Sequence, residues 1–456
     1  MEEAKLLNEI VETEKRLTID DIEIKGVPLW RIVRYHTRLY YINKRSGYIA
    51  GSPTTKEGKK RLKVFSGFWH FVGKKDLRAF FPFNRLVNMN GKYIDKFTDP
   101  VIEESSLCGS NFLVVDPSDF VGDYARVHKK EAISNEGRTI AAQVLKQYYE
   151  YITPRKYGRL IRQLYGKIRE PFLLDDAYLN RLYFEVSHFL FLYHYYHFWF
   201  RILRPKSVFV VYREGYFPQI AVCKKMGIPV AEFQHGITLD NTVSFAGEYD
   251  HRIDPDYFLV FGEYWKGPQF GMPLDRIINI GWAYSKYLQK TIAENTEKHD
   301  KEVLVISSPE ISDAILDTLQ ELSNSDSKYS FDIRLHPCES YNEAQQEKLK
   351  SIPRAQIVDN KTDSALVLPT YRYVVGENSS VIYEALSVGC KVGMLNMCGL
   401  RPAVDLPGIK DNFFIINNRE DFERFLTEDS NQSTSKAEFY SEFDSKHFMD
   451  FIENKM

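Results

Sequence analysis

Two short segments combine polar side chains with a predicted strand end in a way that suits an anionic ligand. In RLHP, His336 is fixed by Pro337 and follows Arg334, at the end of a predicted strand over 331–335. A histidine held in this way can donate a hydrogen bond to a phosphate oxygen, and the arginine can add positive charge. The segment therefore predicts anion contacts, with a packed histidine in a turn as the alternative.

The second segment, residues 376–389, carries Ser379 and Ser380 at the predicted start of a helix. Backbone N–H groups and hydroxyls at a helix N-terminus favour a phosphate because of the helix dipole, although Ser380 can equally be a simple N-cap. Glu384 lies one turn into this helix. We expect it to reach ribose hydroxyls, with a surface glutamate as the alternative.

Two further segments offer a proton acceptor after a predicted strand. In YREGYFPQ, Glu214 is a candidate general base for deprotonating a hydroxyl group, and an ion pair with Arg213 or another cation is the alternative. In FQHGI, His235 precedes a glycine and can act as a hydrogen-bond donor or a base. A structural histidine with satisfied hydrogen bonds is the competing interpretation.

Alternating strand and helix patterns must position these residues. Short apolar runs that end at glycine or polar residues predict parallel βαβ units, and hence an α/β fold with two Rossmann-like domains. We expect an acceptor-binding domain over 1–290 and a donor-binding domain with a final helix over 291–456, with the linker at 289–302. The predicted strands are 62–65, 111–115, 208–211, 229–233, 257–261, 277–280, 303–306, 331–335, 355–358, 373–375 and 391–395.

A helical insertion is predicted at about 137–204, where the sequence is poor in glycine and periodic in Leu, Tyr and Phe. Pro154 and Pro171 are expected to divide it into two or three helices. Within it, residues 183–203 are strongly apolar but contain Glu185, Arg201 and three histidines, which favours a buried aromatic helix over a membrane span. The ligand is expected between the two domains, where the carboxyl ends of the sheets face each other.

Composition excludes several classes of protein. The 456 residues, 44% hydrophobic and 27% charged, can bury two cores, and a net charge of −2 argues against a generally basic nucleic-acid binder. The five cysteines are scattered without a CxxC pair and the N-terminus carries no secretory signal, so we expect a cytoplasmic location. The sequence has no GxxxxGK[ST], GxGxxG, HExxH or GxSxG motif and no DxD text at a strand end, so no metal or other cofactor is demanded.

Residues 29–90 form the one strongly basic stretch, with fourteen Lys or Arg against two acidic residues and many interleaved aromatic side chains. Such a stretch can dock on an anionic membrane surface or a polyanionic acceptor. A solvated basic face is the alternative.

With RLHP, the Ser-Ser pair and QHG (234–236) in place, the chain resembles bacterial surface-polysaccharide transferases of the GT-B fold over roughly residues 205–400. NGKYIDKFTDPV at 90–101 adds a weaker similarity. In families that use CMP-activated sialic acid or Kdo, the resemblance implies that His336 and Pro337 contact CMP and that Ser379 and Ser380 bind its phosphate. Glu214 would belong to the acidic-acidic-Gly base motif, although Arg213 stands at its first acidic position.

The resemblance implies transfer of an ulosonic acid such as Kdo or sialic acid from a CMP-sugar to a capsular or lipopolysaccharide glycan, at the inner face of the plasma membrane. Transferases of CDP-glycerol and CDP-ribitol look similar too, since they carry an HG histidine, an HP segment and a Ser-Ser loop. The EALSVG text at 384–389 is also similar to UDP-sugar transferases and to UDP-GlcNAc 2-epimerases. A non-catalytic partner in polysaccharide synthesis is the remaining alternative.

Overall fold

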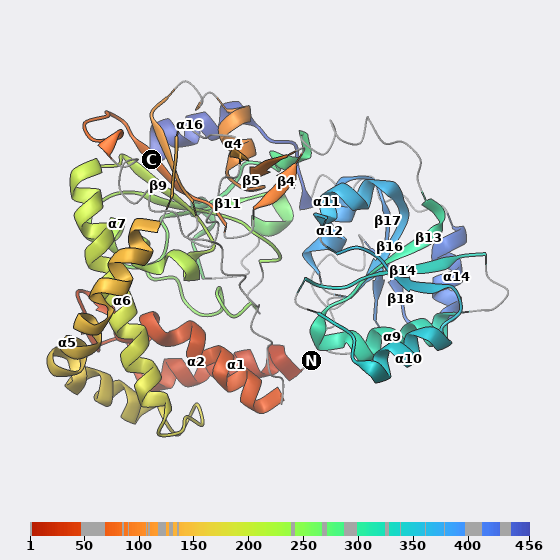
Figure 1. The fold of residues 1–456 in the computed structure, drawn as a ribbon, viewed down its shortest axis with the longest axis horizontal. Helices are drawn as coiled ribbons and strands as arrows, with labels where there is room; N and C mark the ends of the chain where they lie inside the picture. The colour runs from red at the N-terminus through yellow and green to blue at the C-terminus, as the bar shows by residue number, and fades with distance from the viewer. Residues whose placement is uncertain are drawn as a thin grey trace.

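The two predicted α/β domains are present, each built on one parallel sheet, and they lie side by side (Figure 1). The computed structural model describes residues 2–46, 69–83, 86–89, 91–105, 107, 110–116, 125–126, 131–134, 136–238, 242–266, 271–286, 299–323, 328–337, 339–360, 362–377, 379–396, 413–428 and 439–456. The predicted strand at 62–65 lies outside these residues.

The first sheet has seven parallel strands in the order β12-β11-β10-β9-β3-β6-β8. Its central strands are continuous apolar runs such as SVFVV in β9, which is typical of a parallel strand covered on both faces. The strands are β3 (Arg78–Phe81), β6 (Phe112–Asp116), β8 (Ala132–Ser134), β9 (Ser207–Val211), β10 (Val230–Phe233), β11 (Tyr257–Val260) and β12 (Ile277–Asn279).

The second sheet has six parallel strands in the order β15-β14-β13-β16-β17-β18. These are β13 (His299–Ile306), β14 (Ser330–Arg334), β15 (Ala355–Ile357), β16 (Tyr371–Gly376), β17 (Lys391–Leu395) and β18 (Phe414–Ile416). β13 already begins at His299, so residues 299–302 belong to a strand and not to the predicted linker at 289–302. Residues 289–298 of that linker lie outside the described chain. The helices are α9 (Ser312–Leu322), α10 (Glu343–Ser351), α11 (Ser364–Val367), α12 (Ser380–Ser387) and α14 (Arg419–Thr427).

Both sheets reverse their winding direction at an internal point. In the first sheet the chain starts at β3, moves outward through β6 and β8, and then crosses over to β9 on the other side of β3. In the second sheet the same reversal lies between β13 and β16. Open α/β sheets bind ligands at the carboxyl ends of the strands beside such a reversal. The topology therefore singles out the segments after β3, β9 and β10 and those after β13 and β16.

A helical layer covers one side of the first sheet. The predicted insertion forms two helices, α5 (Glu136–Ile168) and α6 (Tyr178–Leu203), with Pro154 inside α5. The expected break at Pro154 is therefore wrong, whereas Pro171 does lie between the two helices. The remaining elements of this domain are α1 (Glu2–Leu17), α2 (Leu29–Ser46), α4 (Asp99–Glu104), α7 (Phe217–Met226), the hairpin β1 (Glu23–Ile24) and β2 (Val27–Pro28), and a small sheet of β4 (Val87–Met89), β5 (Lys92–Ile94) and β7 (Ala125–Arg126).

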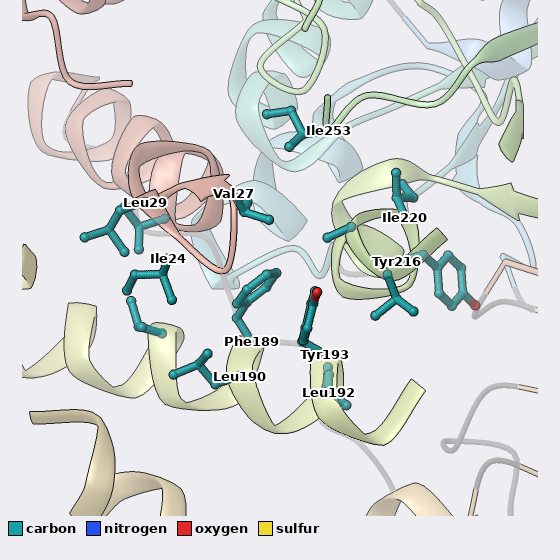
Figure 2. Close-up of a cluster of buried hydrophobic side chains, with 14 of the residues drawn as sticks. Ile24, Val27, Leu29, Phe189, Leu190, Leu192, Tyr193, Tyr216, Ile220 and Ile253 are labelled. Atoms are coloured by element: carbon teal, nitrogen blue, oxygen red, sulfur yellow. The ribbon is translucent and has the colours of Figure 1, made fainter. Parts of the chain in front are cut away.

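The aromatic helix α6 is a core element. Figure 2 shows Phe189 and Tyr193 of α6 turned toward the side on which Val27, before α2, and Ile220 of α7 lie. Among the described residues, no helix combines the length and the apolar character that crossing a bilayer requires. The interpretation of residues 183–203 as a buried helix rather than a membrane span agrees with this packing.

The last residues of the chain return to the first domain. The Trp265 indole N–H donates to the carbonyl of Phe439 at 2.8 Å, and Ser441 exchanges backbone hydrogen bonds with Phe261 and Trp282 at 2.8 and 2.9 Å. The final helix, α16 (Ser445–Lys455), lies on the first sheet beside α4 (Figure 1). The sequence had grouped this helix with the second domain. Its phenylalanines are instead buried with those of the first sheet, where Phe448 packs against the Phe209 and Phe233 rings.

The described part of the basic stretch 29–90 is largely interior. Its aromatic residues Trp30, Phe71, Phe80 and Phe81 are core residues, and three of its arginines are buried in ion pairs. These rings and guanidinium groups have partners inside the domain, whereas Lys44, Trp69 and Lys75 are exposed. The membrane or acceptor surface therefore stays a prediction. Residues 47–68 of the stretch lie outside the described chain.

Candidate functional site

His235 lies at the carboxyl end of β10, between two aromatic rings. Its imidazole is 5.5 Å from the ring of Phe83 and 4.9 Å from that of Tyr212, measured between centroids. Phe83 follows β3 and Tyr212 follows β9, so the three side chains meet where the sheet reverses. Tyr212 has a φ of 76°, an uncommon backbone conformation for a tyrosine that is often found at functional sites.

The imidazole of His235 is held neutral. Burial, followed by the positive charges of Arg213 and Lys96, lowers the pKa of His235 from 6.5 to about 4. Its Nδ1 is buried and has no hydrogen-bond partner within the described residues. Among these residues, nothing satisfies this nitrogen as the alternative of a structural histidine requires. A neutral imidazole can accept a proton or donate its one N–H to a ligand.

The Ser-Ser segment of the second domain meets the QHG segment of the first. Ser379 is the N-cap of α12, with its Oγ 3.3 Å from the backbone nitrogen of Val381, so the alternative that made Ser380 the N-cap is wrong by one residue. Ser380 opens the helix. A Cβ placed on Gly236 would lie 4.0 Å from the Cβ of Ser380, which brings the glycine after His235 next to the start of α12. Two segments that the sequence identified separately therefore face each other across the domains.

Lys96 and Glu384 form an ion pair at the same junction. The Lys96 Nζ lies 2.9 Å from Oε1 of Glu384, and the Ser364 hydroxyl lies 3.4 Å from its Oε2. Burial alone would lower the pKa of Lys96, but the nearby carboxylates, Glu384 first and then Asp363 and Asp95, together raise it above its usual value. Glu384 is thus buried and paired rather than a surface residue. The sequence reasoning missed Lys96, although it lies in the NGKYIDKFTDPV segment that carried the weaker similarity.

The RLHP segment lies two strands away from the Ser-Ser segment, because β13 separates β14 from β16. The guanidinium of Arg334 donates to the carbonyls of Asp359, at 2.7 Å, and of Thr362. These two hydrogen bonds hold the loop after β15 in place. The His336 side chain is partly exposed and Pro337 is exposed at the carboxyl end of β14.

A buried carboxylate fixes the backbone of His336. Oε2 of Glu339 accepts the His336 N–H at 2.9 Å, while its Oε1 accepts the hydroxyls of Ser307 and Ser312 at 2.7 and 2.6 Å. Ser307 follows β13, so Glu339 ties the ends of two neighbouring strands together. No sequence pattern predicted a role for Glu339, because its partners become visible only when β13 and β14 are paired.

Glu214 lies apart from this junction. It belongs to a short 3₁₀ turn, Arg213–Tyr216, and its Oε1 is 3.7 Å from Nη2 of Arg34. Arg213 instead pairs with Glu232, with its Nε 2.7 Å from Oε2. Within the described chain, no hydrogen bond or ion pair joins Glu214 to His235 or to the second domain. Of the two predicted proton acceptors, the structure brings only His235 to the Ser-Ser segment.

Comparisons with known proteins agree with the fold. No protein-family model matches the chain, and no curated protein matches its sequence. A solved structure of UDP-GlcNAc 2-epimerase from Neisseria meningitidis bound to UDP-GlcNAc is 13% identical over 83% of this chain and 100% of that chain, with a TM-score of 0.50. The UDP-GlcNAc 2-epimerase from Methanocaldococcus jannaschii is 12% identical over 83% and 98%, with a TM-score of 0.48.

The wall teichoic acid polymerase TagF is also similar, at 12% identity over 98% of this chain and 97% of that chain, with a TM-score of 0.44. At these identities the likeness concerns the fold. The chain has the GT-B fold, with two Rossmann-like α/β domains, as the sequence predicted.

Proposed function

We propose that the protein is a glycosyltransferase that uses a nucleotide-sugar donor, with the nucleotide on the second domain and the acceptor on the first. The approach of Gly236 to Ser380 carries this proposal, since it joins the reversal points of both sheets in one place. A donor phosphate at the start of α12 would accept hydrogen bonds from the Ser380 hydroxyl and from the backbone N–H groups of the first helical turn. The positive end of the helix dipole would stabilise its negative charge. His336 would add a hydrogen bond from the end of β14.

His235 is the proton acceptor that this geometry favours. The imidazole is neutral at neutral pH, so its lone pair can take the proton of an acceptor hydroxyl as that oxygen attacks the sugar. Its lowered pKa of about 4 makes it a weaker base than an ordinary histidine. The bond from the sugar to the nucleotide phosphate breaks in the same displacement. Lys96 would then offer positive charge toward the departing phosphate, beside the start of α12. Glu214, the other predicted base, becomes an acceptor-binding residue in this scheme.

The finer part of the proposal concerns the donor and the acceptor. The HP and Ser-Ser motifs support a CMP-sugar, with an ulosonic acid such as Kdo or sialic acid transferred to a capsular or lipopolysaccharide glycan. The same motifs also fit a CDP-glycerol or CDP-ribitol phosphotransferase. We place the enzyme in the cytoplasm, at the inner face of the plasma membrane, where such glycans are assembled.

A UDP-GlcNAc 2-epimerase is the second candidate function. It is supported by the EALSVG text and by the fold similarity at a TM-score of 0.50. An epimerase converts its UDP-sugar without an acceptor, so product analysis with and without acceptor glycan separates the two functions. A non-catalytic partner would bind nucleotide without turnover.

A nucleotide panel tests the proposal most directly. CMP, CDP, UDP and GDP are each titrated into the wild type, Ser380→Ala and His336→Ala, with the exposed Ser351→Ala as control. We expect a cytidine nucleotide to raise the Tm, because a ligand at about one hundred times its Kd stabilises by about 2.7 kcal/mol. Both site variants should weaken its binding at least about fivefold, since each loses a hydrogen bond to a charged phosphate. Binding within about threefold of wild type in both variants would contradict the donor site.

A further inference from the structure

Exposed apolar side chains gather on one face of helix α5 in the first domain. Val144, Tyr148 and Tyr151 are spaced four and three residues apart, so they are neighbours on that face. They are 72%, 57% and 58% exposed. A single exposed apolar residue is ordinary, but adjacent large side chains form a patch whose contact with water is unfavourable. The patch therefore suits a partner that offers apolar surroundings.

A ring of the neighbouring helix α6 lies beside this part of α5. The Nζ of Lys146 is 5.8 Å from the ring centroid of Phe184, which is itself 52% exposed. Lys146 is exposed as well, and its Nζ is 3.7 Å from Oε1 of Glu150. Exposed rings and exposed charge thus occur together at the junction of the two helices.

Basic side chains follow the apolar ones along α5 at helical spacing. Arg155, Arg159 and Arg162 come four, eight and eleven residues after Tyr151, and all three are exposed. The guanidinium of Arg155 lies over the Tyr151 ring, 3.4 Å from its centroid, so ring and positive charge are presented together. Residues 144–163 carry five Lys or Arg and one acidic residue. This part of α5 therefore combines exposed rings with an excess of positive charge.

This combination favours an anionic lipid bilayer as the partner. Aromatic side chains bind at the boundary between headgroups and acyl chains, while Lys and Arg extend their charges toward the lipid phosphates. A second copy of the chain would bring the same positive charges together, and they would repel each other. A soluble polyanion would neutralise the arginines but would offer no apolar surroundings to the rings. Only the bilayer matches both properties.

The position of α5 is compatible with such docking. Figure 1 shows α5 on the side of the first domain that is turned away from the second domain. The approach of Gly236 to Ser380 lies between the two domains. A bilayer in contact with α5 would therefore not come between the segments that carry the proposed function.

We propose that one face of α5 docks on an anionic membrane surface. This face, the α5 patch, consists of Val144, Tyr148, Tyr151, Arg155 and Arg159. The apolar side chains enter the interfacial layer of the bilayer, and the two guanidinium groups donate hydrogen bonds to lipid phosphates. The α5 patch is separate from the basic stretch 29–90 that the sequence singled out. Docking does not depend on the proposed transfer reaction, although it would supply the membrane contact that the proposed location requires.

Co-sedimentation with vesicles tests the α5 patch. Vesicles of phosphatidylcholine alone are compared with vesicles of phosphatidylcholine and phosphatidylglycerol. We expect the wild type to bind the anionic vesicles at least about tenfold more tightly. Tyr148→Ser/Tyr151→Ser keeps every charge, and Arg155→Gln/Arg159→Gln keeps every ring. Each double variant should weaken binding to the anionic vesicles at least about tenfold, because it removes one of the two contributions.

Two exposed sites elsewhere provide the controls. Leu274→Ser changes an apolar side chain that is 55% exposed, and Lys350→Gln changes a cation whose side chain is 71% exposed. Both should bind the anionic vesicles as the wild type does. All the replaced side chains are exposed, so every variant should also keep the Tm of the wild type.

Three results would overturn the proposal. The first is a wild type that binds neither kind of vesicle. The second is wild-type affinity of Tyr148→Ser/Tyr151→Ser for the anionic vesicles, since binding would then need only the positive charge, as a polyanion does. The third is a wild-type dimer in sedimentation velocity that this variant dissociates, since the α5 patch would then be covered by a second copy.

Nucleotide titrations on the same variants keep this inference separate from the proposed function. Unchanged nucleotide binding in a variant that no longer binds vesicles supports both. Vesicle binding that depends on the α5 patch, in a protein that binds no nucleotide, would support the docking surface and contradict the proposed function. Nucleotide binding and turnover without vesicle binding would contradict the docking surface alone.

Discussion

The carboxyl edges of the two sheets have the same topology and opposite chemistry. At the edge of the first sheet, rings surround His235, with Phe83 and Tyr212 in contact with its imidazole. At the edge of the second sheet the side chains are small and polar, with Ser379 and Ser380 after β16 and Ser307 after β13. Strand order therefore creates the position of a site, while the few residues after each strand decide its ligand. Hydroxyls at a helix start suit a phosphate, whereas a ring-lined wall sets the pKa and orientation of one imidazole.

The C-terminal segment offers the strongest way to disrupt the ring-lined edge. Gly281 has a φ of +77°, and a Cβ there would overlap the carbonyl of Glu442 and lie 2.7 Å from the backbone nitrogen of Phe443. Gly281→Ala should therefore lower the free energy of unfolding by on the order of 4 kcal/mol, since neither backbone segment can move independently. Urea unfolding followed by tryptophan fluorescence measures this loss.

Gly227→Ala is the matched control for that substitution. Gly227 has a similar φ of +69° but nothing within 4 Å of its Cβ position. It should lose only about 1 kcal/mol, the cost of the left-handed conformation itself. Equal losses in the two variants would show that the contact with the C-terminal segment does not stabilise the first domain.

The pH dependence of stability tests the environment of His235. Because its folded pKa of about 4 lies below the unfolded value of 6.5, the unfolded chain takes up the proton first as the pH falls. The contribution to stability is complete above about pH 6.5 and is lost toward pH 4, by on the order of 3 kcal/mol. His235→Phe keeps a ring in this place and removes the titration, so its stability should exceed that of the wild type increasingly as the pH falls.

The exposed His251→Phe is the control for the pH profile. Its profile should follow that of the wild type, measured as urea midpoints from pH 7 to pH 4. If the urea midpoints of wild type and His235→Phe changed in parallel with pH, the imidazole of His235 would be solvated. The carboxyl edges of the two sheets would then not differ in the way that this pKa implies.

The polar edge should respond to Glu339→Gln by a smaller amount. The amide that replaces the carboxylate cannot accept all three hydrogen bonds from Ser307, Ser312 and the His336 backbone. We expect a loss of about 2 kcal/mol in the free energy of unfolding, because these bonds are made to a buried charge. Glu347→Gln, an exposed change on the same domain, should cost almost nothing. A loss no larger than that of Glu347→Gln would show that Glu339 does not fix the HP segment.

The sequence predicted most of the fold because its strands and helices carry local signals. The apolar run after Pro205 predicted β9 to within one residue, and the predicted strand 391–395 coincides with β17. β3 escaped prediction, since it has only four residues and its phenylalanines were interpreted as part of a basic surface. Pro154 was expected to end a helix on local grounds, but α5 continues through it.

The site was predictable where glycine, serine or histidine follows a strand, as with His235 and Ser380. Its ion pairs were not, because they join residues that only the tertiary structure brings together. Lys96 and Glu384 are 288 positions apart in the chain, and no spacing rule connects them. For the same reason the sequence offered Arg213 as a possible partner of Glu214, while the partner in the structure is Arg34 from α2.

The return of residues 439–456 to the first sheet makes the second domain an insertion within the first. During synthesis, all elements of the second domain, from β13 through α14, leave the ribosome before the C-terminal segment whose Tyr440 covers Phe261 and Trp282. The second domain can therefore fold while the first still lacks part of its core. The chain also passes between the domains twice. Two covalent connections restrict twisting of one domain relative to the other more than one connection does.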